Sequence, residues 1–493
     1  MLSEVEQVRR RLSRNTDANK KSQFGQFLTP AATAAFMAGL FPPAEGHCRL
    51  LDAGAGIGSL SAAFLERWRS GVLCFERVEL DAFEIDDSLH SQLTHTVARY
   101  RGDDFSATLH GDDFIHAATE AITGGLFATS LPQYSHIILN PPYKKIGNDS
   151  AHRLALRRVG IETVNLYSAF VALAVAQAAP AGQIVAIIPR SFCNGPYYRP
   201  FREFMLERAA IRHMHLFASR NKAFKDDAVL QENIIIRLER GGEQGLVTIS
   251  TSTDDTFSDF ASHDHPFERI VFPDDPERFI HVPTLPEAQV IEQCPIVRYA
   301  LAELGIEVST GPVVDFRFKQ YLRDMPALGT VPLLYPVHFS TSGITWPIEG
   351  MKKPNAIERN SDTAKWLYPN GFYCVARRFS AKEESRRIVA SLVDPDAFNG
   401  APALGFENHL NVFHVGRRGL PRALAHGLTV FLNTTLVDEA FRRFSGHTQV
   451  NATDLRCMKY PSCEVLTQLG EWAMRQGALT QGMIDRQFAT ITT

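Results

Sequence analysis

Residues 50–60 read LLDAGAGIGSL, an apolar run that ends in Asp52 and passes into alternating glycines beginning with Gly54 and Gly56. The pattern predicts a β-strand that turns into a helix, because glycine adopts positive φ without steric cost and lets a ligand approach the backbone. Dinucleotide-binding folds use a similar turn, and a purely structural turn looks the same, so the glycines alone specify no ligand. An acid before the first glycine favours a cationic sulfonium ligand with an ammonium group over a pyrophosphate, which the carboxylate would repel.

Short β-runs surround this turn and alternate with helical stretches. Strands spaced by helices imply crossover connections, and Ile- and Val-rich strands suit burial on both faces. We therefore predict an α/β fold with a mainly parallel, Rossmann-like sheet that carries helices on both sides. The expected strands are 48–54, 77–86, 106–112, 135–142, 182–189, 211–217 and 232–238.

The composition of the sequence changes after Arg240, where a glycine-rich turn cluster is followed by the polar stretch 250–267. Such composition is typical of loops. Beyond about residue 290 the segments are short, mixed and rich in aromatics, proline and glycine, which predicts a second domain of mixed α+β type. The expected division is a basic N-terminal arm at 1–22, a sheet domain at 23–245, a linker at 246–290 and a second domain at 291–493.

The composition describes a globular protein and excludes several classes. Of 493 residues, 45 % are hydrophobic and 21 % charged, so the chain is neither disordered nor a single small domain. The net charge of −3 means that nucleic-acid binding would have to use a local basic face. The N-terminus lacks the apolar segment of a secretory signal, no run approaches the roughly 18 apolar residues of a membrane span, and the seven cysteines form no CxxC pair. We expect a cytoplasmic protein with reduced thiols, no membrane contact and no metal site.

The second expected strand ends in Phe-Glu-Ile-Asp at 83–86. A carboxylate at the carboxyl end of this strand can accept hydrogen bonds from both hydroxyls of a ribose. Glu84 is the preferred candidate, with Ile85 against an adenine ring. Other acids nearby stay open as alternatives, because exposed strand acids are often only solvated; they are Glu79, Asp81 and Asp86.

Two further segments supply candidates for the same ligand. GDDF occurs twice, but only the second copy follows a β-run, so Asp113 can accept from an adenine amine while Phe114 stacks on its ring. Upstream, GQFLTP contains Phe27, and Thr29 with Pro30 fits a helix N-cap followed by the first helical position. A helix N-terminus at the sheet edge can hold a carboxylate of the ligand, although the pattern also fits a plain helix start.

The chemical motif is SHIILNPPY at 135–143, an apolar strand that runs into Asn140, Pro141, Pro142 and Tyr143. Two prolines fix φ twice and exclude helix or ladder continuation, so a rigid loop projects from the strand end. An aromatic amine is a poor nucleophile because its lone pair is delocalised into the ring. The side-chain oxygen of Asn140 and the carbonyl oxygen of Pro141 can each accept one amine hydrogen and favour a geometry that presents the lone pair. Tyr143 can stack on a base extruded from a duplex.

With these motifs the chain resembles DNA adenine-N6 methyltransferases of restriction–modification type, in the gamma arrangement. That family has the GQFLTP-like element, the glycine turn, NPPY and a C-terminal target-recognition domain in this order, and the likeness covers about residues 22–240 with specific motifs. The resemblance implies that 23–245 is a methyltransferase catalytic domain with S-adenosyl-L-methionine as cofactor. It also implies double-stranded DNA as substrate and a restriction–modification role, with a cognate restriction endonuclease acting separately if one exists. Phe224 is implied as a second aromatic that holds the flipped adenine, with Phe217 as an alternative.

The second half resembles target-recognition domains more loosely, at 305–317 and 431–461. Polar and basic side chains there can contact phosphates or base edges, and several arginine pairs add local positive charge. Any one arginine pair also fits a solvated surface. The candidate DNA-binding residues are Arg442, Arg443, His447, Thr448, Gln449 and Asn451.

Other functions account for fewer of the motifs. A methyltransferase acting on RNA adenine or on a protein amide would use the same NPPY chemistry, although a protein-glutamine enzyme has no need of so long a C-terminal domain. A nicotinamide-dependent oxidoreductase would use the glycine turn but leaves NPPY unexplained. A non-catalytic nucleic-acid-binding protein would not need the motifs intact. A cytosine-C5 enzyme needs a Pro-Cys loop after the fourth strand, and the sequence has none there.

Overall fold

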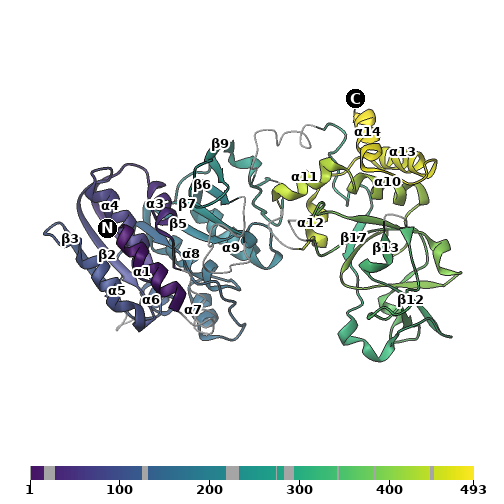
Figure 1. The fold of residues 1–493 in the computed structure, drawn as a ribbon, viewed down its shortest axis with the longest axis horizontal. Helices are drawn as coiled ribbons and strands as arrows, with labels where there is room; N and C mark the ends of the chain where they lie inside the picture. Colours follow the sequence, from purple (N-terminus) through teal and green to yellow (C-terminus); the bar gives the residue numbers. More distant parts are fainter. Residues whose placement is uncertain are drawn as a thin grey trace. The chain divides into compact units, whose positions relative to one another are not determined.

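The computed structural model forms two compact units, residues 1–284 and 285–493, and each has an apolar core of its own (Figure 1). All seven cysteines are free thiols. Among the described helices, none is long and apolar enough to cross a membrane. The structure describes residues 2–15, 28–124, 131–217, 232–273, 275–282, 294–340, 343–380, 384–444 and 449–492.

A nine-stranded sheet forms the centre of the first unit, in the order β3-β2-β1-β4-β5-β7-β6-β8-β9. Strands β1 to β4 are parallel to their neighbours, whereas β7 is antiparallel to both β5 and β6. The chain order reverses between β1 and β4, which is where open α/β sheets bind ligands. All seven predicted strands are confirmed. The strands are β1 (Glu45–Ala53), β2 (Cys74–Phe83), β3 (Phe105–His110), β4 (Tyr134–Leu139), β5 (Ala178–Pro189), β6 (Ala209–Phe217), β7 (Asn233–Arg240), β8 (Leu246–Ser252) and β9 (Ala261–Pro266).

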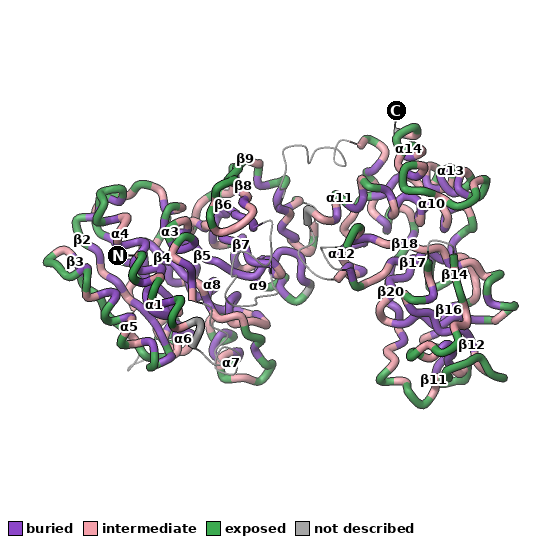
Figure 2. Tube along the Cα trace, viewed as in Figure 1, coloured by how far each residue is buried: buried purple, intermediate pink, exposed green. Residues whose placement is uncertain are grey.

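Helices cover both faces of this sheet, because its central strands are apolar on both sides (Figures 1 and 2). Along β5, Ile184 and Ile188 enter one apolar cluster, whereas Val185 and Ile187 enter another. This alternation confirms the predicted burial on two faces. The helices of the unit are α1 (Leu2–Asn15), α3 (Ala31–Gly39), α4 (Ser59–Arg69), α5 (Asp87–Ala98), α6 (Phe114–Thr123), α7 (Ala151–Arg158), α8 (Leu166–Gln177) and α9 (Arg199–Arg208).

The expected linker at 246–290 is wrong for its described part. β8 pairs in parallel with β6, and β9 pairs antiparallel with β8, so both strands extend the sheet. Phe267, Ile270 and Ile280 then pack into the core of the first unit. The polar composition was misleading because β9 is an exposed edge strand, whose side chains need not be apolar.

The expected basic arm at 1–22 is corrected in its first part, because α1 packs on the sheet domain. Val5 is buried, and other apolar side chains of α1 contact the same core cluster. Arg9 is buried as well, and its guanidinium donates to the carboxylate of Glu6 one turn earlier at 2.9 Å. That carboxylate also accepts from the backbone N–H at the start of α3 at 3.0 Å. Residues 16–22 lie outside the described residues.

The second unit is a mixed α+β domain, as predicted. It contains a four-stranded sheet in the order β10-β20-β17-β18, a five-stranded sheet in the order β11-β15-β12-β19-β16, and the pair β13-β14. Its strands are β10 (Glu307–Thr310), β11 (Leu322–Arg323), β12 (Thr330–Leu334), β13 (Phe339–Ser340), β14 (Gly343–Ile344), β15 (Ala356–Glu358), β16 (Leu367–Pro369), β17 (Tyr373–Arg377), β18 (Ala390–Val393), β19 (Ala403–Phe406) and β20 (Leu410–His414). Its helices are α10 (Arg422–Leu432), α11 (Thr435–Phe444), α12 (Ala452–Cys457), α13 (Cys463–Met474) and α14 (Gln481–Thr492).

Candidate active site

The glycine turn between β1 and α4 adopts the conformation that its sequence predicts. Gly54, Gly56 and Gly58 have φ values of 82°, 57° and 83°, where a larger residue would be strained. The backbone N–H of Gly54 donates to the carbonyl oxygen of Phe83 at 2.9 Å, which ties the turn to the end of β2. The turn therefore lies against the carboxyl end of the second strand, as a ligand site at this sheet edge requires.

A cavity of about 330 Å³ opens beside the turn, at the carboxyl ends of β1 to β4. It brings together most of the predicted cofactor residues, which come from four separate strand ends. Those that line the cavity are Gly54, Gly56, Glu84, Ile85, Asp113, Phe114 and Asn140, together with Pro142 of the chemical motif. The structure thus brings these residues together at the predicted edge of the sheet, while their binding of a cofactor stays a prediction.

Glu84 is the acid of the second strand that lines the cavity. Its two carboxylate oxygens accept from the backbone N–H groups of Gly56 at 2.8 Å and Asp86 at 2.7 Å, so its position is fixed by the glycine turn itself. A carboxylate oxygen has more than one acceptor site, so bound ribose hydroxyls can still donate to it. Ile85 beside it is 48 % exposed, as expected for an apolar side chain that would pack against an adenine ring.

The alternative acids have other partners. Asp81 bonds to His110 at 2.9 Å and accepts from the hydroxyl of Tyr134 at 3.0 Å. Asp86 caps the start of α5, where its side chain accepts from the backbone N–H of Ser88 at 3.0 Å. Together with the half-buried Glu79, these acids do not line the cavity, which leaves Glu84 as the candidate.

Asp52 does not line the cavity, contrary to expectation. Its side chain is fully buried, and one carboxylate oxygen accepts from both the backbone N–H and the hydroxyl of Ser61, at 3.1 and 2.6 Å. Burial raises the pKa of Asp52 to about 7, partly opposed by these hydrogen bonds from Ser61. The acid therefore holds the first turn of α4 against β1 rather than a ligand, because the strand end turns its side chain into the protein.

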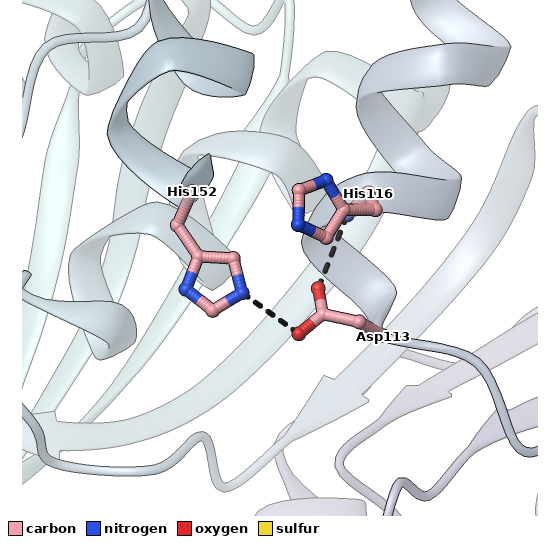
Figure 3. A group of neighbouring side chains, drawn as sticks. All are labelled: Asp113, His116 and His152. Atoms are coloured by element: carbon pink, nitrogen blue, oxygen red, sulfur yellow. Dashed lines mark hydrogen bonds and ion pairs between the residues drawn. The ribbon is translucent and has the colours of Figure 1, made fainter. Parts of the chain in front are cut away.

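Asp113 lines the cavity and caps α6. One carboxylate oxygen accepts from the backbone N–H groups of Ile115 and His116, at 2.9 and 3.1 Å. The other bonds to Nε2 of His152, at 2.9 Å, so the start of α7 is joined to the start of α6 (Figure 3). Burial opposes ionisation of Asp113, but the hydrogen bond and charge of His152 keep the pKa of its carboxyl below the usual value. The same bond outweighs burial of the imidazole and raises the pKa of His152.

The imidazole of His116 completes a group with Asp113 and His152 (Figure 3). One potential ligand atom of each residue lies within 4.8 Å of those of the other two. At this spacing the three atoms could coordinate one divalent cation. Both α6 and α7 begin here, however, and the positive ends of their helix dipoles disfavour an additional cation. The absence of a metal site therefore stays a prediction.

Asn140 lies directly after β4, and its amide group is held on both sides. Its Nδ2 donates to the hydroxyl of Thr29 at 3.0 Å, and its Oδ1 accepts from the hydroxyl of Tyr143 at 3.2 Å. The hydroxyl of Tyr143 is also 3.2 Å from the carbonyl oxygen of Ile187 on β5. Because an amide oxygen has two lone pairs, Oδ1 of Asn140 can still accept from a substrate amine. Tyr143 is half-buried and thus positions Asn140, while its stacking on a base stays a prediction.

The GQFLTP element contacts the NPPY motif, but Thr29 and Pro30 do not have the predicted positions at the start of a helix. Helix α3 has Pro30 at its N-cap, so Thr29 is not the cap and Pro30 is not the first helical residue. Thr29 is buried and reaches Asn140 instead of the helix N-terminus. Neither residue lines the cavity. Phe27 and Phe224 lie outside the described residues.

Several cavity residues carry no signal in the sequence. Lys144 and His152 follow the chemical motif, and Leu166 and Phe170 lie on α8, where apolar residues are indistinguishable from the ordinary core. Leu28 also lines the cavity, next to the predicted Thr29. Their contribution depends on how α7 and α8 fold back onto the strand ends, which no local pattern specifies.

The recognition candidates of the second unit that the structure describes all have hydrogen-bond partners or helix-capping positions. Arg442 bonds to Asp438 at 2.8 Å one turn earlier on α11, and Asn451 directly precedes α12. These two residues hold helices and are weaker candidates than predicted for DNA contact. Gln449 is half-buried and accepts from Arg378 at 3.3 Å. His447, Thr448 and the side chain of Arg443 lie outside the described residues.

Comparison with known proteins identifies the family. Residues 81–224 match a family model described as Eco57I restriction-modification methylase. The chain is 53 % identical over 468 residues to the type II methyltransferase M.BsuBI of Bacillus subtilis, an alignment that covers 94 % of this chain and 93 % of that protein. The chain belongs to the DNA methyltransferases of type II restriction–modification systems. As a member of that family, this methyltransferase is a modification enzyme with S-adenosyl-L-methionine as its cofactor. The cavity beside Glu84 offers a carboxylate and apolar side chains, which suit the ribose and the adenine ring of that molecule.

Two other relatives differ in how much of the methyltransferase they cover. The type II methyltransferase M.PstI of Providencia stuartii is 41 % identical over 473 residues, which span 94 % of this chain and 92 % of that protein. A tRNA1(Val) (adenine(37)-N6)-methyltransferase of Shewanella woodyi is 25 % identical over 222 residues, which span 42 % of this chain and 84 % of that protein. The likeness over nearly the full length is thus to type II methyltransferases, and it includes the second unit.

Proposed function

We propose that this methyltransferase transfers a methyl group from S-adenosyl-L-methionine to the N6 amine of an adenine flipped out of double-stranded DNA. The observation that carries the proposal is that Asn140 lines the same cavity as Glu84, in a loop fixed by two prolines. A separate restriction endonuclease that cuts the same unmethylated site is the expected counterpart. The relative from Shewanella woodyi bears adenine-N6 in its name, which supports adenine as the target base.

The cofactor is held by the first three strand ends. Gly54 and Gly56 leave space for a ligand against the backbone, Glu84 accepts from the ribose hydroxyls and Ile85 covers one face of the adenine ring. Asp113 and Phe114 line the same cavity, where Asp113 accepts from the adenine amine and Phe114 stacks on its ring. When bound, S-adenosyl-L-methionine supplies an electrophilic methyl group.

Asn140 and the following prolines act on the substrate amine. Nδ2 of Asn140 donates to Thr29, so its Oδ1 is oriented away from that residue and can accept one hydrogen of the adenine amine. The carbonyl oxygen of Pro141 accepts the other. Two acceptors fixed before the reaction begins favour the amine geometry that presents its lone pair to the methyl group, at no reorganisation cost in the transition state.

An RNA adenine is the second candidate substrate. The cofactor cavity and NPPY serve either nucleic acid, and the tRNA relative aligns with less than half of the chain. A separate unit of about the size expected for target recognition follows the sheet domain here, and the long alignments to type II methyltransferases include it. This arrangement favours double-stranded DNA.

The test combines Asn140→Ala and Tyr143→Phe with Asn148→Ala, an exposed asparagine of the following loop, as the matched control. Loss of a preorganised acceptor in Asn140→Ala should lower the rate of methyl transfer on the order of 100- to 1,000-fold. Tyr143→Phe keeps the ring and removes only the hydroxyl that holds Asn140, so a smaller rate loss is expected with unchanged substrate affinity. The measurements are transfer of labelled methyl to duplex DNA, cofactor binding and thermal melting for each variant. Near-normal methylation by Asn140→Ala, or labelled cytosine in place of adenine, would refute the proposal.

A further inference from the structure

Three segments of the second unit that are distant in sequence meet at one polar cluster. The backbone N–H of Arg378 donates to the carbonyl oxygen of His409 at 2.8 Å, and the backbone N–H of Val450 donates to the carbonyl oxygen of Arg378 at 2.7 Å. Phe379 and Gln449 are paired in a short β-bridge. These hydrogen bonds bring together the segments that carry His409, Phe379 and Gln449, here called the 379–409–449 cluster.

His409 is held by a buried carboxylate. Glu407 is fully buried, and its two oxygens lie 2.5 and 2.7 Å from Nδ1 of His409; one of them also accepts from the backbone N–H of His409 at 2.9 Å. The imidazole itself is 43 % exposed, and within the described residues its Nε2 has no hydrogen-bond partner. A carboxylate at Nδ1 orients the ring, so that in the neutral imidazole Nε2 is presented to solvent as an acceptor.

Phe379 lies against this imidazole, and Gln449 is paired with Phe379. The ring of Phe379 is 41 % exposed and lies 4.9 Å from that of His409, centroid to centroid. The guanidinium of Arg378 lies 5.8 Å from the centre of the Phe379 ring and donates to Oε1 of Gln449 at 3.3 Å. Because Oε1 is held from one side, the amide nitrogen of Gln449 is the end available for an external acceptor.

The hydrogen-bonding groups of this arrangement are complementary to those at the edge of a base pair. An imidazole Nε2 accepts from the exocyclic amine of adenine or cytosine, a Gln amide nitrogen donates to N7 or to O6 or O4 of a neighbouring base, and an exposed ring packs on a thymine methyl group. We propose that the 379–409–449 cluster reads base edges in the major groove of the target duplex. The inference rests on the proposed function and names residues that set the recognised sequence.

A purely structural role explains fewer of these features. A pair that only fixed the loop would be satisfied by the bond between Glu407 and the backbone N–H of His409, and would not require an imidazole with one exposed edge. Exposed Phe379 beside it contributes little to the core of the unit. Orientation of a half-exposed polar side chain by a buried partner is how specific sites keep their contacts in register.

The experiment uses the full chain and duplexes in which each base pair of the site methylated by the wild type is changed in turn. His409→Ala and Gln449→Ala are compared with Gln476→Ala, a half-buried glutamine after α13 in the same unit. Each cluster variant should lose about 10- to 100-fold in kcat/KM on the cognate duplex, and discrimination at one base pair should fall by the same factor. Discrimination at the other base pairs, cofactor affinity and thermal melting should match those of Gln476→Ala.

The possible failures can be told apart. If the wild type methylates no adenine in duplex DNA, the proposed function is overturned, and the inference with it. If the wild type is site-specific but His409→Ala and Gln449→Ala keep its full discrimination profile, the inference alone is overturned. A uniform loss at every base pair, as removal of a phosphate contact would cause, also overturns it, as does a loss that follows a lower melting temperature.

Discussion

At the scale of single residues, two carboxylates close to the glycine turn have sharply different environments. Glu84 is nearly fully buried yet lines the cavity, and its position is set by backbone N–H groups of the glycine turn and of Asp86. Asp52 lies only two residues before that turn and is directed into the protein, where Ser61 satisfies it. Two acids with similar sequence signals thus have different surroundings, because Glu84 lines the cavity and Asp52 is bound to the start of α4.

We expect Glu84→Ala to bind S-adenosyl-L-methionine at least about tenfold more weakly, since one hydrogen bond to a charged group contributes about 1.5–3 kcal/mol. Glu79→Ala, within the strand that Glu84 follows but outside the cavity, should bind as the wild type does. Titration calorimetry of both variants gives the comparison. Equal affinity for the cofactor in Glu84→Ala and the wild type would remove Glu84 from the site.

At the scale of elements, the bond between Asp113 and His152 joins α6 to α7 beside the cavity. A histidine whose folded pKa is raised adds stability that is present below its ordinary pKa of 6.5 and lost as the pH rises through the folded value. The lowered pKa of Asp113 has the opposite sense, because its contribution is lost as the pH falls through that lowered value. The pair therefore stabilises this contact at mildly acidic pH and less so in alkaline solution.

The corresponding prediction concerns His152→Ala. The wild type should exceed this variant in stability by about 1 kcal/mol or less at pH 6, because the pair is partly solvated, and the difference should shrink by pH 9. His116 and Lys144 are the other charged groups near the pair, so His116→Ala serves as the control and should keep most of the pH dependence. Denaturant titrations across this pH range measure it. A difference that is constant with pH would mean that the bond carries no ionic component.

In the second unit, α10 and α13 cross at two glycines. A Cβ atom on Gly427 would lie 1.6 Å from the carbonyl oxygen of Leu466, and one on Gly470 would lie 1.7 Å from that of Ala423. Backbone atoms cannot move aside as a side chain can, so Gly427→Ala should lower the stability of this unit by about 2 kcal/mol or more. Gly477→Ala, with open space around it, is the control. Chemical denaturation should show a separate shift for the second unit, and cofactor binding by the first should persist; an unchanged transition would show that the helices do not cross this closely.

At the scale of the whole molecule, we expect catalysis and recognition to belong to different units. A fragment of residues 1–284 includes the complete cavity and the strands that the sequence suggested were linker. We expect it to bind S-adenosyl-L-methionine with the affinity of the full chain but to lose efficient methylation of a specific site. DNA binding by the full chain should weaken steeply with added salt, because neutralised phosphates release counterions.

The comparison is made by titration calorimetry and by methylation of cognate and scrambled duplexes with fragment and full chain. A shorter fragment of residues 1–245 should fold poorly, because it lacks β8, β9 and the apolar side chains that follow them. Efficient site-specific methylation by the 1–284 fragment would contradict the division of labour between the units.

The sequence by itself determined the parts of this methyltransferase that depend on neighbouring residues. Seven strands, the glycine turn, Glu84 and the rigid loop at Asn140 were predictable, because alternation of apolar runs, positive φ at glycine and fixed φ at proline are local properties. Parallel strands also bring their carboxyl ends to one edge, which was enough to predict that these residues share a site.

Only the tertiary structure decided the rest. The burial of Asp52, the contact of Thr29 with Asn140 and the bond between Asp113 and His152 join groups that belong to different elements. Strand β9 was missed because an edge strand may be polar on both faces, and the 379–409–449 cluster because its members come together only when three loops are hydrogen-bonded to one another. Such features arise from packing between distant segments, whose free energy no single stretch of sequence contains.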